Sequence, residues 1–106
     1  MAWVILFIAG ILEIVWAYAM KLSDGFSRPG PAAVTLGAMF LSFGLLAVAM
    51  KSLPLGTAYT VWTGIGAVGA FIVGIVVLGE AATPMRVLAA LLIISGLVLM
   101  KLSSPA

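Results

Sequence analysis

Cysteine and histidine are both absent from the 106-residue sequence, and only 8% of its residues are charged. Without these two residue types the chain cannot use thiol catalysis, disulfide bonds, Cys/His zinc sites or haem ligation by histidine. We therefore expect no metal site and no cofactor. The five Lys and Arg residues outnumber the three Asp and Glu residues, but no two cations are adjacent. The sequence therefore has no basic patch of the kind that indicates binding of nucleic acid.

Hydrophobic residues, in contrast, make up 65% of the chain, whereas soluble proteins contain about 45–50%. A globular chain this short leaves roughly 40% of its unfolded surface exposed, so it cannot hide that much apolar surface from water. The mean hydropathy of +1.37 is also the opposite of a disordered composition. The composition therefore excludes a water-soluble single domain and predicts an integral membrane protein.

Three short, charged and turn-rich stretches divide the sequence into four apolar segments. A helix needs about 20 residues to cross a hydrocarbon core of about 30 Å. The last segment approaches this length only if Thr83 is the N-cap and Pro84 the first helical residue, with Arg86 extending to the interface. We therefore predict an all-α membrane protein with a single four-helix transmembrane domain over residues 1–106. The predicted helices cover residues 2–21, 32–50, 56–79 and 83–101.

The cations are divided almost evenly between the two sides of such a bundle. Lys51 and Lys101 lie on the side of the termini, and Lys21, Arg28 and Arg86 lie on the other side. A positive-inside excess normally fixes orientation, and two cations against three is hardly an excess. Two interpretations stay open. Either a weakly biased protein is oriented by its first helix, or both insertions are populated and form antiparallel homodimers.

Glu13 is the only charged residue inside an apolar segment. Counted from Trp3, it lies about 15 Å deep, near the bilayer midplane. A carboxylate at that depth costs at least ~2.5 kcal/mol on insertion scales, so a functional role is the default hypothesis. The group can hold a proton or an organic cation but not both, and this competition is a sufficient basis for exchange. The alternative is a protonated glutamate that is hydrogen-bonded to a neighbouring helix for packing alone.

The helix face that carries Glu13 also carries small and aromatic residues at helical spacing. Gly10 and Ala17 permit the close approach of another helix or a ligand. Trp16, one turn from Glu13, offers an indole N–H and an aromatic face, and such faces attract cations by about 0.5–2 kcal/mol. Trp16 is therefore a candidate binding residue, although it can also face lipid or the interface.

Three further candidates lie in the second and third segments. Ser42 lies at a depth similar to that of Glu13, and its hydroxyl can donate either to that carboxylate or back to its own helix. Tyr59 and Trp62 are one turn apart and share a helix face, but they also fit an interfacial aromatic belt.

The run 64–69 matches the GxGxxG pattern of dinucleotide-binding sites, but it lacks the preceding strand and the following acidic residue of such a site. It indicates instead a helix that packs closely and bends.

Taken together, these motifs are similar to those of a known family. They are Gly10-Ile-Leu-Glu13-Ile-Val-Trp16, Lys21-Leu-Ser-Asp-Gly-Phe26 and the run from Lys51 through Tyr59 and Trp62 to Gly66. The sequence resembles the small multidrug resistance family over essentially its whole length, with the same spacing of four helices. Within that family it looks like the guanidinium-exporter subtype, to which Trp16 and the Trp62-Thr-Gly-Ile-Gly66 run point.

The resemblance implies a secondary active transporter rather than an enzyme, a multi-pass protein of the bacterial inner membrane. It implies an antiparallel, dual-topology homodimer in the lipid bilayer that exports guanidinium or a small guanidinyl cation by alternating access. Entering protons are the coupling ion, and no cofactor is involved. The positions to which the resemblance assigns substrate and proton binding are Glu13, Trp16, Ser42, Tyr59, Trp62 and Gly10.

The nearest alternative is a family exporter of quaternary ammonium or other hydrophobic cations, which lack the N–H donors that a carboxylate binds in pairs. A non-transporting membrane subunit and a proton-binding ring component are rivals of a different class. A ring component needs only a helical hairpin, whereas this chain has four predicted helices and several aromatic residues around Glu13. A heterodimer with a paralogue of fixed topology also stays open, and the nearly balanced cations argue mildly against it.

Overall fold

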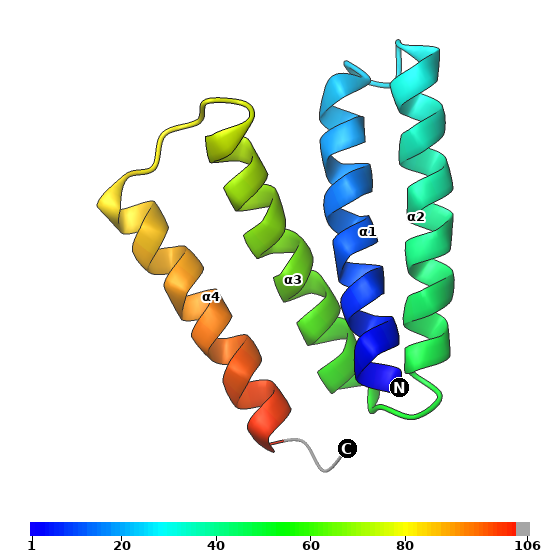
Figure 1. Ribbon diagram of the computed structural model, residues 1–106, viewed down its shortest axis with the longest axis vertical. Coiled ribbons are helices and arrows are strands. Elements are labelled where there is room, and N and C mark those ends of the chain that lie inside the picture. Colours follow the sequence, from blue (N-terminus) through cyan, green and yellow to red (C-terminus); the bar gives the residue numbers. More distant parts are fainter. Residues whose placement is uncertain (104–106) are drawn as a thin grey trace.

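The computed structural model describes residues 1–103, and this part of the chain is all helical (Figure 1). Its helices are α1 (Ala2–Leu22), α2 (Pro29–Ala49), α3 (Leu55–Val76) and α4 (Pro84–Ser103). Each of the four is long and apolar enough to cross a membrane, because about 20 residues at 1.5 Å per residue span the hydrocarbon core. The predicted all-helical fold with four candidate transmembrane helices is confirmed.

Two helix ends differ from the predicted ones by three residues, and the others differ by at most two. α2 begins at Pro29 rather than at residue 32, because a proline at the first helical position lacks only an N–H that has no partner there. α3 ends at Val76 rather than at residue 79, and Gly79 beyond it has a φ of +72°, a conformation that favours glycine. Residues 104–106 of the predicted domain lie outside the described part of the chain.

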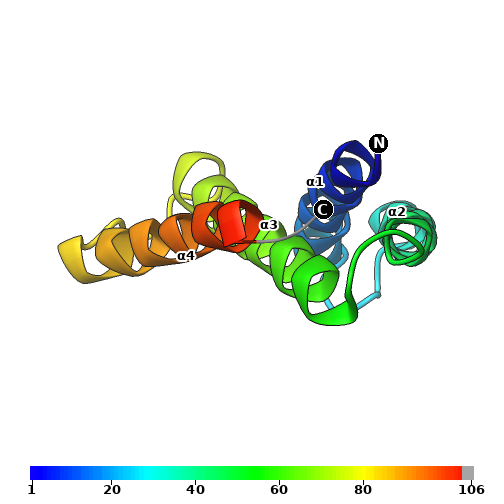
Figure 2. The ribbon, with the colours of Figure 1, turned by 90° about the horizontal axis from the view of Figure 1, so that it is seen from below.

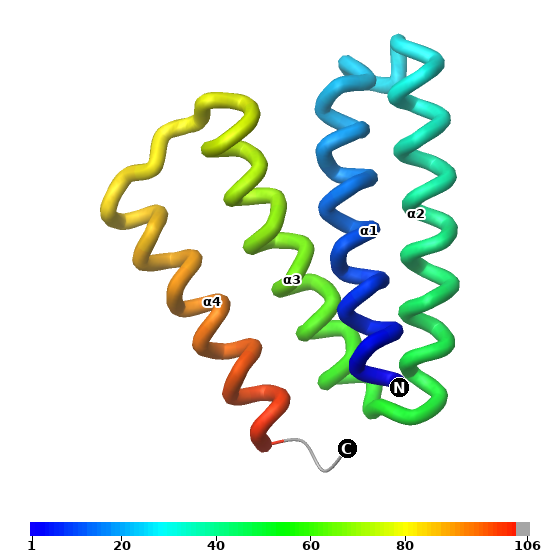
Figure 3. Tube along the Cα trace, viewed as in Figure 1, coloured from blue at the N-terminus to red at the C-terminus, as the bar shows by residue number. Residues whose placement is uncertain are grey.

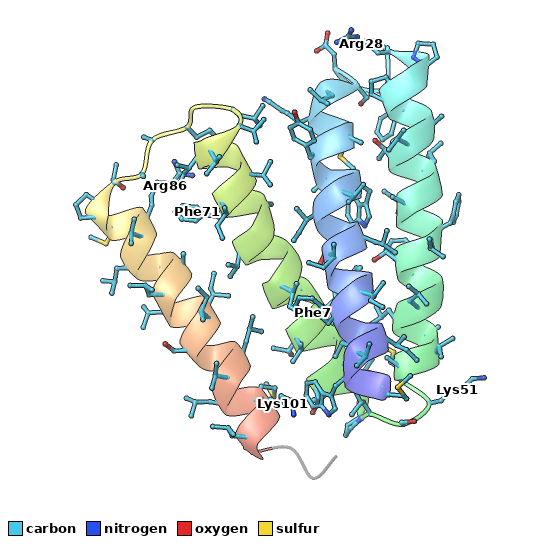
Figure 4. The ribbon with its side chains drawn as sticks, in the orientation of Figure 1. Phe7, Arg28, Lys51, Phe71, Arg86 and Lys101 are labelled. Carbon is cyan, nitrogen blue, oxygen red and sulfur yellow. The ribbon has the colours of Figure 1, made fainter. Side chains whose placement is uncertain are left out.

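The predicted N-cap of α4 is confirmed. The Thr83 hydroxyl accepts a hydrogen bond from the Arg86 N–H at 3.3 Å, which caps the helix. The Arg86 guanidinium turns back over the loop, where it donates to the Ala81 carbonyl at 2.7 Å and lies 3.7 Å from the Glu80 carboxylate. It also lies over the ring of Phe71 in α3, 5.3 Å from the centroid (Figure 4). Arg86 therefore ties the α3–α4 loop to both of its helices.

The helices lie side by side in the order α2, α1, α3, α4, so that α1 packs against both α2 and α3 (Figure 1, Figure 3). α4 packs mainly against α3 and reaches α1 through Lys101, whose ammonium lies 4.8 Å from the ring centroid of Trp3. Seen end on, the helices form a layer rather than a closed bundle (Figure 2). The Cα atoms extend over 43 × 34 × 16 Å, and most residues of each of the four helices are not buried within the chain. One chain therefore leaves both faces of this layer largely uncovered.

Glycines in α1 and α3 allow these two helices to approach each other closely. A Cβ atom at Gly10 would lie 2.6 Å from Cγ2 of Ile65, and a Cβ atom at Gly69 would overlap the Ile14 side chain. Neither position has room for a side chain, so the glycines set the distance between the two helices. The candidate site lies on this same α1–α3 contact.

Gly10→Ala should destabilise the chain, although alanine favours helix. Its methyl group meets the branched Cβ of Ile65, and overpacking of this kind costs about 1–3 kcal/mol. Gly37→Ala is the matched control, because nothing lies within 4 Å of a Cβ at Gly37 and the helix gains up to about 1 kcal/mol. Thermal unfolding in detergent micelles, followed by circular dichroism, measures both. Equal stability of the two variants would contradict the close α1–α3 contact.

Candidate functional site

Glu13 lies in the middle of α1, and its carboxyl group is directed at α3. It meets the backbone of Gly66, because a Cβ atom at that position would overlap the carboxyl carbon and Oε1. With glycine at position 66, the carboxyl group lies directly against the α3 backbone, with no side chain between them. The sequence indicated these glycines only as features of a closely packing helix, and no spacing signal connects Gly66 with Glu13.

Two polar atoms at this place have no hydrogen-bond partner among residues 1–103. They are Oε1 of Glu13 and Nε1 of Trp16, one turn apart in α1, and both are buried. One is an acceptor and the other a donor. A buried polar atom without a partner is costly, above all in a membrane. Oε1 of Glu13 can therefore accept a proton or an N–H group of a ligand, whereas Nε1 of Trp16 can only donate to an acceptor.

Ser42 makes neither of the hydrogen bonds that its position in the sequence suggested. Its hydroxyl donates to the Ala9 carbonyl of α1 at 2.7 Å, not to the Glu13 carboxylate and not to its own helix. Its oxygen also accepts a hydrogen bond from Nε1 of Trp62 at 3.0 Å. Ser42 and Trp62 are 0% and 7% exposed. Ser42 bonds to Ala9 because α2 packs on α1 in a way that places the Ser42 hydroxyl directly against the α1 backbone.

Aromatic side chains of α1, α2 and α3 form one continuous series of ring contacts. Trp16 contacts Phe43 edge-on, with ring centroids 6.3 Å apart. Phe43 contacts Trp62 at 5.8 Å, and Trp62 contacts Tyr59 at 5.7 Å. Trp62 is thus an interior residue rather than part of an interfacial belt, whereas Tyr59 is 53% exposed. Sequence reasoning missed Phe43, because both of its neighbours in the series lie on other helices.

Gly10, the remaining candidate, is buried at the α1–α3 contact, where it faces Ile65 rather than the carboxyl group. It lies one turn before Glu13 and lets α3 come close to α1. This close approach is what allows the backbone of Gly66 to reach the Glu13 carboxyl group. Gly10 therefore shapes the site through the distance between the helices.

No group of three or more His, Cys, Asp or Glu residues that could hold a metal ion occurs within residues 1–103. The groups that do meet here are a carboxyl acceptor, an indole donor and several aromatic faces. A carboxylate accepts two N–H groups of a planar cation side by side, and aromatic rings attract its charge. This set of groups suits reversible binding of a proton or of a small organic cation.

The fold and this site define a small, multi-pass helical membrane protein with one carboxyl group inside its spans. Comparison with known proteins then identifies the family. A family model described as Small Multidrug Resistance protein matches residues 1–103. The chain belongs to the small multidrug resistance family, as the sequence motifs predict.

Bacterial relatives match the chain over nearly their full length. The guanidinium exporter of Escherichia coli K12 is 60% identical over 104 residues, which cover 98% of this chain and 99% of that protein. The guanidinium exporter of Yersinia pseudotuberculosis is also 60% identical, over 98% of this chain and 100% of that protein. The guanidinium exporter of Salmonella typhimurium is 56% identical, over 98% of this chain and 99% of that protein.

Gly66→Ala is expected to destabilise the chain by about 0.5–1.5 kcal/mol, because its methyl group overlaps the Glu13 side chain and forces it away from its rotamer. Glu13→Ala should restore most of that loss, since it removes the overlapping atoms. The unfolding free energies of both single variants and the double variant in detergent micelles form the cycle that measures this coupling. Additive effects, with no recovery in the double variant, would show that the two residues do not meet.

Proposed function

We propose that the chain is a proton-coupled antiporter that exports guanidinium ion across the bacterial inner membrane. The observation that carries this proposal is the Glu13 carboxyl group in the middle of α1, whose buried Oε1 has no partner within residues 1–103. Relatives up to 60% identical over 98% of the chain are named guanidinium exporters, which supports the choice of substrate. The site is suited to that cation by its chemistry.

Guanidinium is a planar cation whose N–H groups point outward in its plane. An ionised Glu13 can accept two of them side by side, as carboxylates do with the guanidinium group of arginine. Trp16 and Phe43, in edge contact at 6.3 Å, offer ring faces on which the cation can stack. A quaternary ammonium ion has no N–H to donate and forfeits the paired contact. The site therefore favours guanidinium over the quaternary ammonium alternative.

Coupling follows from competition for the same carboxyl oxygens. Guanidinium binds the ionised Glu13, so the proton that the group held must leave to the side on which the site is open. After the site opens to the other side, a proton from that side replaces the cation. Each cycle thus moves guanidinium outward and a proton inward, and the inward proton gradient drives export.

A second, inverted copy completes the site in this proposal. One chain is a layer with a short dimension of 16 Å, so it does not surround a cation on all sides. α4 has no buried residue within Pro84–Ser103 and is strongly apolar, which suits it to contact with another chain. An inverted partner would bring a second Glu13 to the same cavity. The nearly equal numbers of cations on the two sides favour insertion in both orientations.

Glu13→Gln is expected to abolish proton-coupled guanidinium transport, because glutamine has the same size but neither ionises nor releases a proton. The measurement is guanidinium uptake into proteoliposomes under an imposed pH gradient. Glu80→Gln is the control, since Glu80 is 45% exposed in the α3–α4 loop, 3.7 Å from Arg86, where an ion pair contributes little. Substantial proton-driven guanidinium transport by the Glu13→Gln variant would contradict the proposed mechanism.

Dual topology predicts that one loop position is reached from both sides of the membrane. The chain has no cysteine, so Ser52→Cys in the exposed α2–α3 loop introduces a unique thiol. A membrane-impermeant maleimide should label about half of the thiols in intact cells and the rest only after permeabilisation. Labelling of nearly all or nearly none of them from outside would show one fixed orientation and overturn the antiparallel homodimer.

A further inference from the structure

Two linked hydrogen bonds connect α1, α2 and α3 beside the turn that carries Glu13. The indole N–H of Trp62 donates to Oγ of Ser42 at 3.0 Å, and the Ser42 hydroxyl donates to the Ala9 carbonyl at 2.7 Å. Both side chains are buried. We call this pair of bonds, from Trp62 through Ser42 to Ala9, the three-helix link.

The three-helix link uses every hydrogen-bond donor that its two side chains possess. A serine hydroxyl has one donor hydrogen, and an indole ring has one N–H. Both are engaged within the link, so neither remains for the Glu13 carboxylate. In contrast, Oε1 of Glu13 and Nε1 of Trp16 have no partner within residues 1–103. The structure thus separates the expected binding residues into those already engaged and those open to a ligand.

The acceptor of the link belongs to the turn of α1 that leads to Glu13. In an α-helix each N–H bonds to the carbonyl four residues earlier, so the Ala9 carbonyl also receives the Glu13 N–H within α1. A carbonyl oxygen has two lone pairs and accommodates both donors. Through this shared carbonyl, α2 and α3 act on the backbone that holds the Glu13 carboxyl group.

Few other contacts join α2 to α3, because each of them packs mainly against α1. The ring contact between Phe43 and Trp62, at 5.8 Å between centroids, lies directly beside the link, since Phe43 follows Ser42 in the chain. The link is therefore the polar tie that holds α3, and Gly66 with it, in register with α1 and α2.

We infer that Ser42 is a positioning residue: together with Trp62 it fixes the Glu13 turn against α2 and α3, and it does not bind the cation. The kinetic test of this inference rests on the proposed guanidinium exchange, whereas the structural test does not. Without the link, Glu13 and Trp16 keep their contacts with the cation, so the half-saturating concentration changes little. During the movement that exposes the site to the other side of the membrane, α3 is then no longer held in register with α1 and α2. The maximal exchange rate therefore falls.

The kinetic test compares Ser42→Ala, Trp62→Phe and the double variant in proteoliposomes. Each single variant should lower the maximal exchange rate about three- to tenfold, as expected for an interhelical hydrogen bond in a membrane, with a half-saturating guanidinium concentration within about twofold of wild type. The double variant should be no slower than the slower single variant, because both substitutions break the same link.

Thr35→Val is the matched control for these variants. It also removes a fully buried hydroxyl group from α2, but that hydroxyl bonds within its own helix, to the Pro31 carbonyl at 2.8 Å. Transport by this variant should therefore resemble that of the wild type. A decrease in the maximal exchange rate equal to that of Ser42→Ala would show that removing any buried hydroxyl group from α2 slows transport. This result would contradict the positioning role of Ser42.

The structural test uses the proton–nitrogen NMR signal of the Trp62 indole in bicelles, without substrate. Trp62→Phe removes and thereby assigns this signal among those of the three tryptophans. Ser42→Ala should shift it, because the indole loses its acceptor, whereas Thr35→Val should leave it in place. An unmoved signal in Ser42→Ala overturns the inference.

A rise of about tenfold in the half-saturating concentration of Ser42→Ala at unchanged rate also overturns it, because such a change marks a direct cation ligand. A wild-type protein that exchanges no guanidinium overturns the proposed function instead. In that case the NMR signal still decides whether the link exists.

Discussion

The contact between the Glu13 carboxyl group and the backbone of Gly66 is the constraint on which the rest of the structure depends. A carboxyl group inside a membrane is costly, and glycines accommodate it here. Gly66 leaves room for it, and Gly10 lets α3 approach α1 closely enough to form its wall. A protein that only had to bury a glutamate would satisfy its oxygens from within. Here Oε1 has no partner in residues 1–103, which suits a group that exchanges its ligand.

The layered arrangement explains how so small a chain can take part in a transport cycle. Larger transporters place their sites between internal inverted repeats. This chain has one carboxyl group in its spans and a layer 16 Å thick, with α4 at its edge. The proposed inverted copy supplies the missing repeat and the second Glu13. In that proposal the two Glu13 groups would share one cavity and would titrate as a unit, not as separate sites.

Composition and charge spacing are sufficient to predict what depends on one helix at a time. The four candidate spans, the Thr83 cap and the place of Glu13 within its span follow from residues that are close in sequence. Contacts between helices do not follow in this way. Ser42 bonds to the Ala9 carbonyl, and Phe43 joins two tryptophans. These partners depend on how α2 and α3 cross α1, and spacing along a single helix carries no information about that crossing.

The central claim is exchange of guanidinium for protons, and a flux measurement on the purified wild-type protein in proteoliposomes tests it most directly. With an imposed pH gradient and equal guanidinium on both sides, guanidinium should accumulate in the more acidic compartment while protons flow the other way. Inverting the pH gradient should invert the direction of accumulation. Guanidinium that stays evenly distributed, although the protein is folded and dimeric, would contradict the account.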